Sequence, residues 1–153
     1  MKKTEIDSLL EALRCCNINW IVVFPSTGLD VVYAYYQEKN RCLYTTREEE
    51  AVAIASGLTI GGDRPLVLMQ QSGVGNALNA VFTLADAYDV FFPILVCDRS
   101  ELDPNPVQRV SSKSTKQVLE PLGCSWVDWS EPNAIEKFRS CLERRSRWII
   151  CPN

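Results

Sequence analysis

Hydrophobic positions along the chain follow two alternating patterns. Short continuous apolar runs, typical of strands buried on both faces, occur at 20–24, 42–45, 66–70, 93–97, 125–128 and 148–151. Between them, apolar residues at helical spacing predict helices over 5–14, from the break at 25–28 to about 37, over 47–60, from the loop at 71–75 to about 85, over 113–121 and over 131–144. Strands that alternate with helices predict an α/β fold, with a doubly wound, mostly parallel sheet of about six strands and helices on both faces.

Cap and turn residues set the limits of the 47–60 helix. Thr46 and Glu49 have the spacing of a capping box at its start, and Gly61-Gly62-Asp63 is predicted to end it. Because successive helical residues are about 100° apart, a Glu49 that closes the cap leaves Glu48 pointing elsewhere. We therefore expect Glu48 to project beyond the edge of the sheet.

Two further boundaries concern the last third of the chain. Residues 99–112 are polar and contain Pro104 and Pro106, which predicts an irregular excursion over the surface before the 113–121 helix. Ser130 is predicted to cap the last long helix. No linker, repeat or low-complexity segment interrupts the pattern, so residues 1–153 are expected to form a single domain.

Composition narrows the function classes. The chain has 153 residues and a formal net charge of −3, which does not suggest a nucleic-acid partner, and its apolar runs are too short to span a membrane. The N-terminus is not the basic-then-apolar stretch of a secretory signal, so the expected location is the cytoplasm.

Histidine is absent, which excludes His-based catalytic pairs. The seven cysteines contain no C-x-x-C pair and are predicted to be mostly small buried residues in a reducing compartment.

Candidate chemistry lies beyond the carboxyl ends of the predicted strands, where ligands bind in such sheets. The segment 71–76, Gln-Ser-Gly-Val-Gly-Asn, has glycines that let the backbone approach a ligand, and a helix with free N–H groups follows it. It is not a Walker motif, because no lysine follows. Taken alone, a tight strand-to-helix turn also explains this segment, and a favourable helix-dipole interaction also explains the acids at 48–50.

Two separated segments together resemble one family. The runs at 47–57, Arg-Glu-Glu-Glu-Ala-Val-Ala-Ile-Ala-Ser-Gly, and at 68–76, Leu-Met-Gln-Gln-Ser-Gly-Val-Gly-Asn, are similar to the sulfopyruvate and phosphonopyruvate decarboxylases, which use thiamine diphosphate. The likeness includes Asn79, the segment 84–86, the strand at 93–95 and Arg99, and it covers most of the chain from about residue 20 to 122. The Arg-Glu-Glu-Glu form and the short chain are most like the separate alpha subunit of sulfopyruvate decarboxylase.

The resemblance implies roles for individual residues. Glu48 would be catalytic, with its carboxylate hydrogen-bonded to the N1′ nitrogen of the cofactor's aminopyrimidine. The cofactor-binding set would be Gln71, Ser72, Gly73, Gly75 and Asn76. The substrate, a small anionic 2-oxo acid, would be contacted by Pro25, Ser26, Arg99 and Gln108. Arg99 is also explained as a surface residue that pairs with Asp98 or Glu101, and Ser100 stands where glycine is common in the family.

The resemblance also implies a partner. The family needs a Gly-Asp-Gly segment and a later asparagine, which hold Mg²⁺ and the diphosphate, and this sequence contains no Gly-Asp-Gly. Residues 1–153 would then be the pyrimidine-binding (Pyr) domain, with no metal ligand of its own. The diphosphate-binding domain is expected on a beta subunit, in a hetero-oligomer of alpha and beta chains.

Three alternatives stay open. The substrate could be another 2-oxo acid, with phosphonopyruvate first among them. The chain could be a catalytically silent regulatory or partner subunit, although such a subunit has no need of Glu48. It could also be an unrelated flavodoxin-like module that binds phosphate at 72–76, although a match over two separate segments argues against that.

Overall fold

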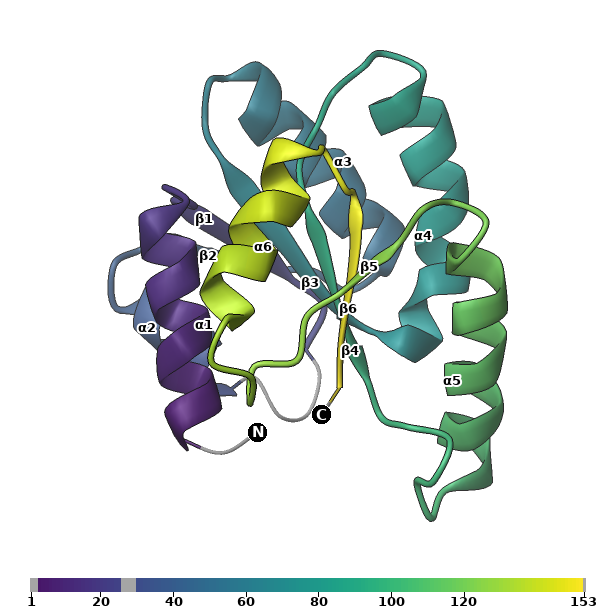
Figure 1. Ribbon diagram of the computed structural model, residues 1–153. Coiled ribbons are helices and arrows are strands. Elements are labelled where there is room, and N and C mark those ends of the chain that lie inside the picture. Colours follow the sequence, from purple (N-terminus) through teal and green to yellow (C-terminus); the bar gives the residue numbers. More distant parts are fainter. Residues whose placement is uncertain (1–2, 26–29, 153) are drawn as a thin grey trace.

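The apolar runs form six parallel strands in one sheet, within residues 3–25 and 30–152, which are those that the computed structural model describes (Figure 1). The strands are β1 (Trp20–Val23), β2 (Cys42–Tyr44), β3 (Pro65–Gln70), β4 (Ile94–Asp98), β5 (Ser125–Trp126) and β6 (Trp148–Pro152). They lie in the order β2-β1-β3-β4-β6-β5, and all neighbouring pairs are parallel. The predicted α/β fold with a doubly wound sheet is confirmed.

Helices cover both faces of this sheet. One face carries α1 (Lys3–Cys15), α2 (Asp30–Gln37) and α6 (Ala134–Glu143), and the other carries α3 (Glu48–Ile60), α4 (Val74–Ala80) and α5 (Pro106–Leu119) (Figure 1). The short 3-10 helix η1 (Gln71–Gly73) joins β3 to α4, and the π-helical turn η2 (Val81–Asp86) extends α4. Across residues 3–25 and 30–152, the structure has no helix that is long and apolar enough to cross a membrane.

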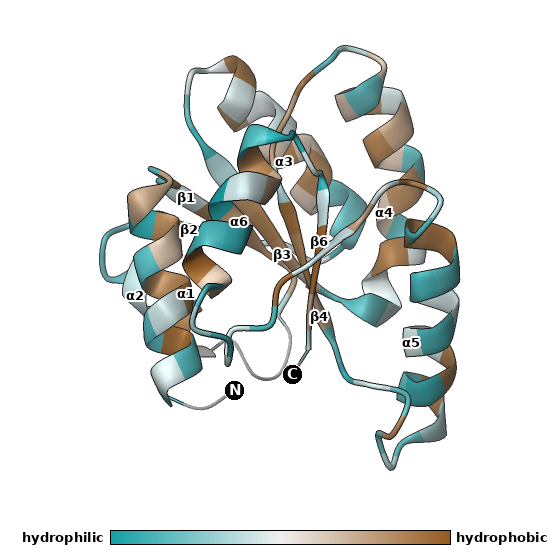
Figure 2. Ribbon diagram, viewed as in Figure 1, coloured by the Kyte–Doolittle hydropathy of each residue, from teal (hydrophilic) through white to brown (hydrophobic). Residues whose placement is uncertain are grey.

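Alternate residues of each strand belong to different cores, because successive side chains of a strand point to opposite faces. In β3, Leu66 and Leu68 belong to the cluster that includes α1, α2 and α6, whereas Val67 and Met69 belong to the cluster that includes α3 and α4. All four are fully buried, and burial of each such side chain contributes about 1.5–3 kcal/mol. Figure 2 shows the result, with hydrophobic strands in the centre and hydrophilic positions on the outer sides of the helices.

The seven cysteines are all free thiols. Cys16, Cys97, Cys141 and Cys151 are buried, as predicted, whereas Cys15 is exposed. Cys97 and Cys151 face each other across β4 and β6, with their sulfur atoms 3.8 Å apart. The hydrogen bond with Cys151, together with burial, raises the pKa of the Cys97 thiol well above its usual value. This thiol is therefore protonated and unreactive at neutral pH.

The prediction for residues 99–112 is wrong in its second half. Helix α5 begins at Pro106 and not at residue 113, because Asn105 and Pro106 together form a helix start. The Asn105 side chain accepts a hydrogen bond from the Val107 N–H at 2.9 Å, and Pro106 occupies the first turn, where a missing N–H costs nothing. The two prolines that suggested an irregular segment thus flank a helix cap.

Two other cap predictions are corrected. Helix α6 begins at Ala134, and Ser130 does not cap it. Instead, the backbone N–H and the hydroxyl of Ser130 both donate to the Asp128 carboxylate. At the start of α3, the N-cap is Arg47 and not Thr46, and no side chain caps it; Glu50, and not Glu49, accepts from the Thr46 N–H at 2.9 Å. The predicted end of α3 is confirmed, since Gly62 follows it with a φ of 91°, a conformation that favours glycine.

We expect Asn105→Ala to lower the free energy of unfolding by about 1 kcal/mol, because the Val107 N–H loses its acceptor. The matched control is Asn133→Ala, since Asn133 holds the same position before α6 but its side chain makes no cap hydrogen bond. We expect a change of less than about 0.5 kcal/mol for this control. Urea unfolding followed by circular dichroism measures both values, and equal losses would contradict the assignment of the cap.

Candidate active site

The order of the strands reverses at one point of the sheet. Strand β1 lies between β2 and β3, so the chain moves to one side of β1 and then crosses to the other. Ligands bind at such a reversal, beyond the carboxyl ends of the strands. The segments that follow β2, β3 and β4 bring Glu48, the 71–76 segment and Arg99 to this edge. Three predicted site regions therefore meet where the fold predicts a ligand.

Glu48 is the first residue of α3 and is buried, with 8% of its surface exposed. Its Oε2 atom accepts a hydrogen bond from the Asn76 side-chain amide at 3.0 Å. Its Cγ atom lies so close to Gly73 that a Cβ atom there would be only 2.6 Å away. Glycine at position 73 is therefore required by the approach of a side chain, and the 71–76 segment is more than a turn.

The three acids of the α3 first turn point in three directions. Glu48 meets Asn76, Glu49 pairs with Arg47 (Nε–Oε1, 2.6 Å), and Glu50 accepts from Thr46. A backbone hydrogen bond and the Arg47 guanidinium lower the pKa of Glu49. The expectation that Glu48 points away from its neighbouring acids is confirmed, although Glu50, and not Glu49, bonds to Thr46. All three carboxylates lie near the positive end of the helix dipole.

Gln71 organises the second half of the site. It is buried, with 1% exposed, and its side-chain amide donates to Gln108 Oε1 at 2.7 Å. Its Oε1 atom accepts from the Arg99 backbone N–H at 3.3 Å, and its backbone carbonyl accepts from the Thr115 hydroxyl at 2.8 Å. Gln71, Arg99 and Gln108 were all predicted site residues, and the structure brings them together.

Arg99 forms an ion pair that differs from both partners suggested by the sequence. Its Nη2 atom lies 2.9 Å from Asp103 Oδ2, while Lys116 pairs with Asp98 and Glu101, each at 3.3 Å. A hydrogen bond from the Asn105 backbone, followed by the interaction with Arg99, lowers the pKa of Asp103. The loop between β4 and α5 is thus held by charged groups, and Arg99 is part of that loop.

The remaining predicted residues are less enclosed. Ser72, Gly75 and Asn76 are exposed at this end of the sheet, and Pro25 is exposed just after β1. Ser26 lies outside the described residues. Ser100 has a φ of 72°, which gives a physical reason for the glycine that is common at this position in the family.

Thr115 and Lys116 are the polar neighbours of the site that the sequence did not indicate. Both residues belong to α5. Thr115 lies 44 residues after Gln71 in the sequence, and no local pattern indicates that either residue is near the site. Their positions depend on the packing of α5 beside η1. No group of three or more His, Cys, Asp or Glu side chains suited to a metal ion occurs within the described part of the chain.

Solved structures define the class of fold. A structure from Mycobacterium smegmatis, described as a "putative thiamin diphosphate-dependent enzyme", matches with a TM-score of 0.65 at 16% sequence identity. The match covers 99% of this chain and 30% of that chain. The fold is therefore one found in part of a larger thiamin diphosphate-dependent enzyme.

Sequence relatives identify the family. Sulfopyruvate decarboxylase subunit alpha from Methanocaldococcus jannaschii is 30% identical over 116 residues, which are 74% of this chain and 69% of that relative. Sulfopyruvate decarboxylase subunit alpha from Methanococcus maripaludis is 25% identical over 135 residues, 86% of this chain and 81% of that relative. No family model matches the chain. The chain belongs to the family of sulfopyruvate decarboxylase alpha subunits.

The contact between Gly73 and Glu48 predicts opposite effects for two glycine substitutions. Gly73→Ala places a methyl group against the Glu48 side chain and is expected to lower the free energy of unfolding by about 1–3 kcal/mol. Gly75→Ala meets no atom within 4 Å and lies in α4, so we expect no loss and a gain of up to about 1 kcal/mol. Chemical denaturation of both variants measures the difference, and two variants of equal stability would contradict the close contact.

Proposed function

We propose that this chain is the alpha subunit of a two-subunit, thiamine-diphosphate-dependent decarboxylase, which converts 3-sulfopyruvate to sulfoacetaldehyde and carbon dioxide. The observation that carries the proposal is the buried Glu48 carboxylate, held by Asn76 beside Gly73 at the end of the sheet where ligands bind. The names of the Methanocaldococcus and Methanococcus relatives support the substrate.

The residues around Glu48 suit the aminopyrimidine of thiamine diphosphate. Gly73 offers a surface without a side chain, and Asn76 fixes one carboxylate oxygen, so the carboxyl group has a set orientation. Glu48 would hold a proton between its carboxylate and the pyrimidine N1′ nitrogen. When bound, the cofactor supplies the electron sink for the pair released as carbon dioxide leaves. The role of the protein is to orient the ring and to stabilise the charge on it.

Gln71, Ser72, Gly73, Gly75 and Asn76 are proposed to line the pyrimidine side. Gln71 acts as a positioning residue, because its side chain is buried and ties the β4–α5 loop to α5. Its neutral side-chain amide can accept from the Arg99 N–H and donate to the Gln108 side-chain carbonyl at the same time, because an amide has both an acceptor and donors.

The substrate side is assigned to Pro25, Ser26, Arg99 and Gln108. Arg99 and Gln108 are joined through hydrogen bonds to Gln71, which hold them close together. A guanidinium next to this unit suits a substrate with a sulfonate or carboxylate group, since its planar fork matches such oxygens.

The diphosphate and Mg²⁺ are assigned to a beta subunit that carries Gly-Asp-Gly, and this chain is assigned as the Pyr domain of an alpha–beta hetero-oligomer. The sequence has no Gly-Asp-Gly. The printed names of the relatives, which call them alpha subunits, support a partner chain.

Exposed apolar residues beside the site support the same partner. Val107 and Val110 are 65% and 67% exposed on the helix that carries Gln108, and Leu102 is 90% exposed in the preceding loop. Apolar side chains in such numbers next to a functional edge are typical of a surface that another protein covers. We propose that the beta subunit docks here and completes the site.

We expect Glu48→Gln to reduce turnover of the reconstituted alpha–beta pair by about 10²–10⁴-fold, because the neutral amide cannot hold the proton. The substitution keeps the size and the hydrogen-bond acceptor for Asn76, so assembly with the partner should persist. Glu49→Gln is the matched control, since Glu49 pairs with Arg47 on the exposed side of the same turn. Rates with sulfopyruvate, phosphonopyruvate and pyruvate identify the substrate. If the alpha–beta pair with Glu48→Gln is as active as the unsubstituted pair, the assignment of Glu48 as the catalytic residue is wrong.

We expect the isolated chain to bind thiamine diphosphate at least about 100-fold more weakly than the alpha–beta pair, because the charge-assisted contacts to the diphosphate are missing. Isothermal titration calorimetry with and without the beta chain measures this ratio. Tight binding by the isolated chain that disappears in Glu48→Gln would contradict a site divided between two chains.

A further inference from the structure

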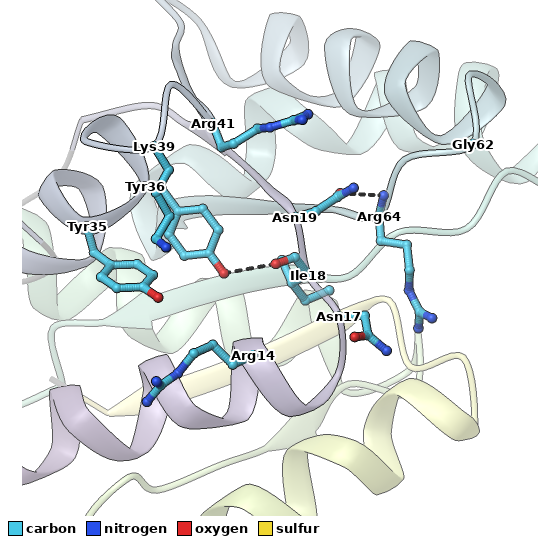
Figure 3. A pocket seen from close by; sticks show the side chains of 10 residues that line it. All are labelled: Arg14, Asn17, Ile18, Asn19, Tyr35, Tyr36, Lys39, Arg41, Gly62 and Arg64. Carbon is cyan, nitrogen blue, oxygen red and sulfur yellow. Dashed lines mark hydrogen bonds between the residues drawn. The ribbon is translucent and has the colours of Figure 1, made fainter.

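A second hollow lies at the opposite end of the sheet from Glu48. It has a volume of about 610 Å³ and is lined by Arg14, Lys39, Arg41 and Arg64, with Tyr35 and Tyr36 among the other residues (Figure 3). Arg41 and Arg64 directly precede β2 and β3, whereas Glu48 and the 71–76 segment follow these strands. The hollow is therefore separate from the candidate active site, and its size is that of a small-molecule site.

The lining of this hollow is positively charged although the whole chain is acidic. Four cations contribute to it, and no Asp or Glu does, while the formal net charge of the chain is −3. Arg14 pairs with Glu11 at 2.5 Å. Lys39, Arg41 and Arg64 have no ion pair with any residue that the structure describes.

Aromatic rings contact two of these cations, one through the lining residue Tyr35 and one through Trp20, which is not part of the lining. The Lys39 ammonium lies 4.8 Å from the centre of the Tyr35 ring, and the Arg41 guanidinium lies 4.8 Å from the centre of the Trp20 ring. Such contacts orient a cation without neutralising its charge. Tyr36 is fixed by a hydrogen bond from its hydroxyl to the Ile18 carbonyl, which Figure 3 shows as a dashed line between two lining residues.

A neighbouring hollow at the same end of the sheet shows what a neutralised arginine cluster looks like. It is lined by three arginines, at 144, 145 and 147, but also by Asp86 and Asp89. Two of these arginines are paired, Arg145 with Asp89 and Arg147 with Asp86, both at 2.8 Å. Ion pairs thus neutralise Arg145 and Arg147, whereas three of the four cations of the 610 Å³ hollow have no ion pair among the described residues.

We propose that the hollow lined by Arg14, Lys39, Arg41 and Arg64 binds a small phosphorylated anion that carries at least two negative charges. Guanidinium and ammonium groups are the usual donors to phosphate oxygens, and several cations around one cavity favour a multiply charged ligand. The Tyr35 ring adds a flat apolar surface for the organic part of such a ligand. The site stands independently of the function proposed above, since it shares no residue with it.

The probe is inorganic pyrophosphate, titrated into the full chain by calorimetry at low ionic strength. We expect saturable binding that weakens in 1 M salt, because exposed charges are screened there. The double variant Lys39→Gln/Arg64→Gln should weaken binding about 100-fold, at roughly tenfold for each cation removed. The charge-preserving variant Lys39→Arg/Arg64→Lys should retain most of the affinity.

The matched control is Arg144→Gln, which removes an exposed arginine from the neighbouring hollow and should leave binding unchanged. Thermal melts of all variants verify that each is folded. A second titration with adenosine triphosphate tests the ring surface: tighter binding than pyrophosphate that Tyr35→Leu abolishes supports it. Absence of pyrophosphate binding, or full affinity in the folded Lys39→Gln/Arg64→Gln variant, would overturn the proposal.

Discussion

The contact between the Glu48 side chain and Gly73 is the constraint on which the rest of the site depends. A Cβ atom at position 73 would collide with the Glu48 side chain, so glycine there lets Glu48 lie against the segment that follows β3. This approach buries a carboxylate that would otherwise lie in water at the end of a helix. Burial of a charged group is costly unless it is hydrogen-bonded, and here Asn76 supplies the bond.

The two ends of the sheet carry different chemistry for a common reason. Parallel strands place all their carboxyl ends at one edge and all their amino ends at the other, so residues that precede strands gather in space as surely as those that follow them. Glu48, Gln71 and Arg99 follow strands and build the candidate active site, whereas Arg41 and Arg64 precede strands and line the basic hollow. One sheet thus supports two separate polar sites.

The sequence predicted the sheet well because buried parallel strands read as continuous apolar runs. It predicted α5 poorly, because Pro104 and Pro106 suggest a loop unless Asn105 is recognised as a cap. The direction of Glu48 was predicted correctly, although Glu50, and not Glu49, bonds to Thr46 and the helix begins without the predicted capping box. The Arg99–Asp103 ion pair and the hydrogen bond from Thr115 to Gln71 could not be predicted. Both depend on how the β4–α5 loop and α5 pack in the folded chain, which no local sequence pattern indicates.

Small residues on two helices explain how the site becomes so close-packed. Helix α3 presents Ala51 and Ala55 to the core, and α4 presents Ala77 and Ala80, so the two helices pack against each other with short side chains between them. Short side chains let helix axes approach, and this brings Glu48 and Asn76 within hydrogen-bonding distance although neither side chain is long. The alanine-rich pattern, which by itself indicates only a buried helix, therefore also sets the geometry of the carboxylate.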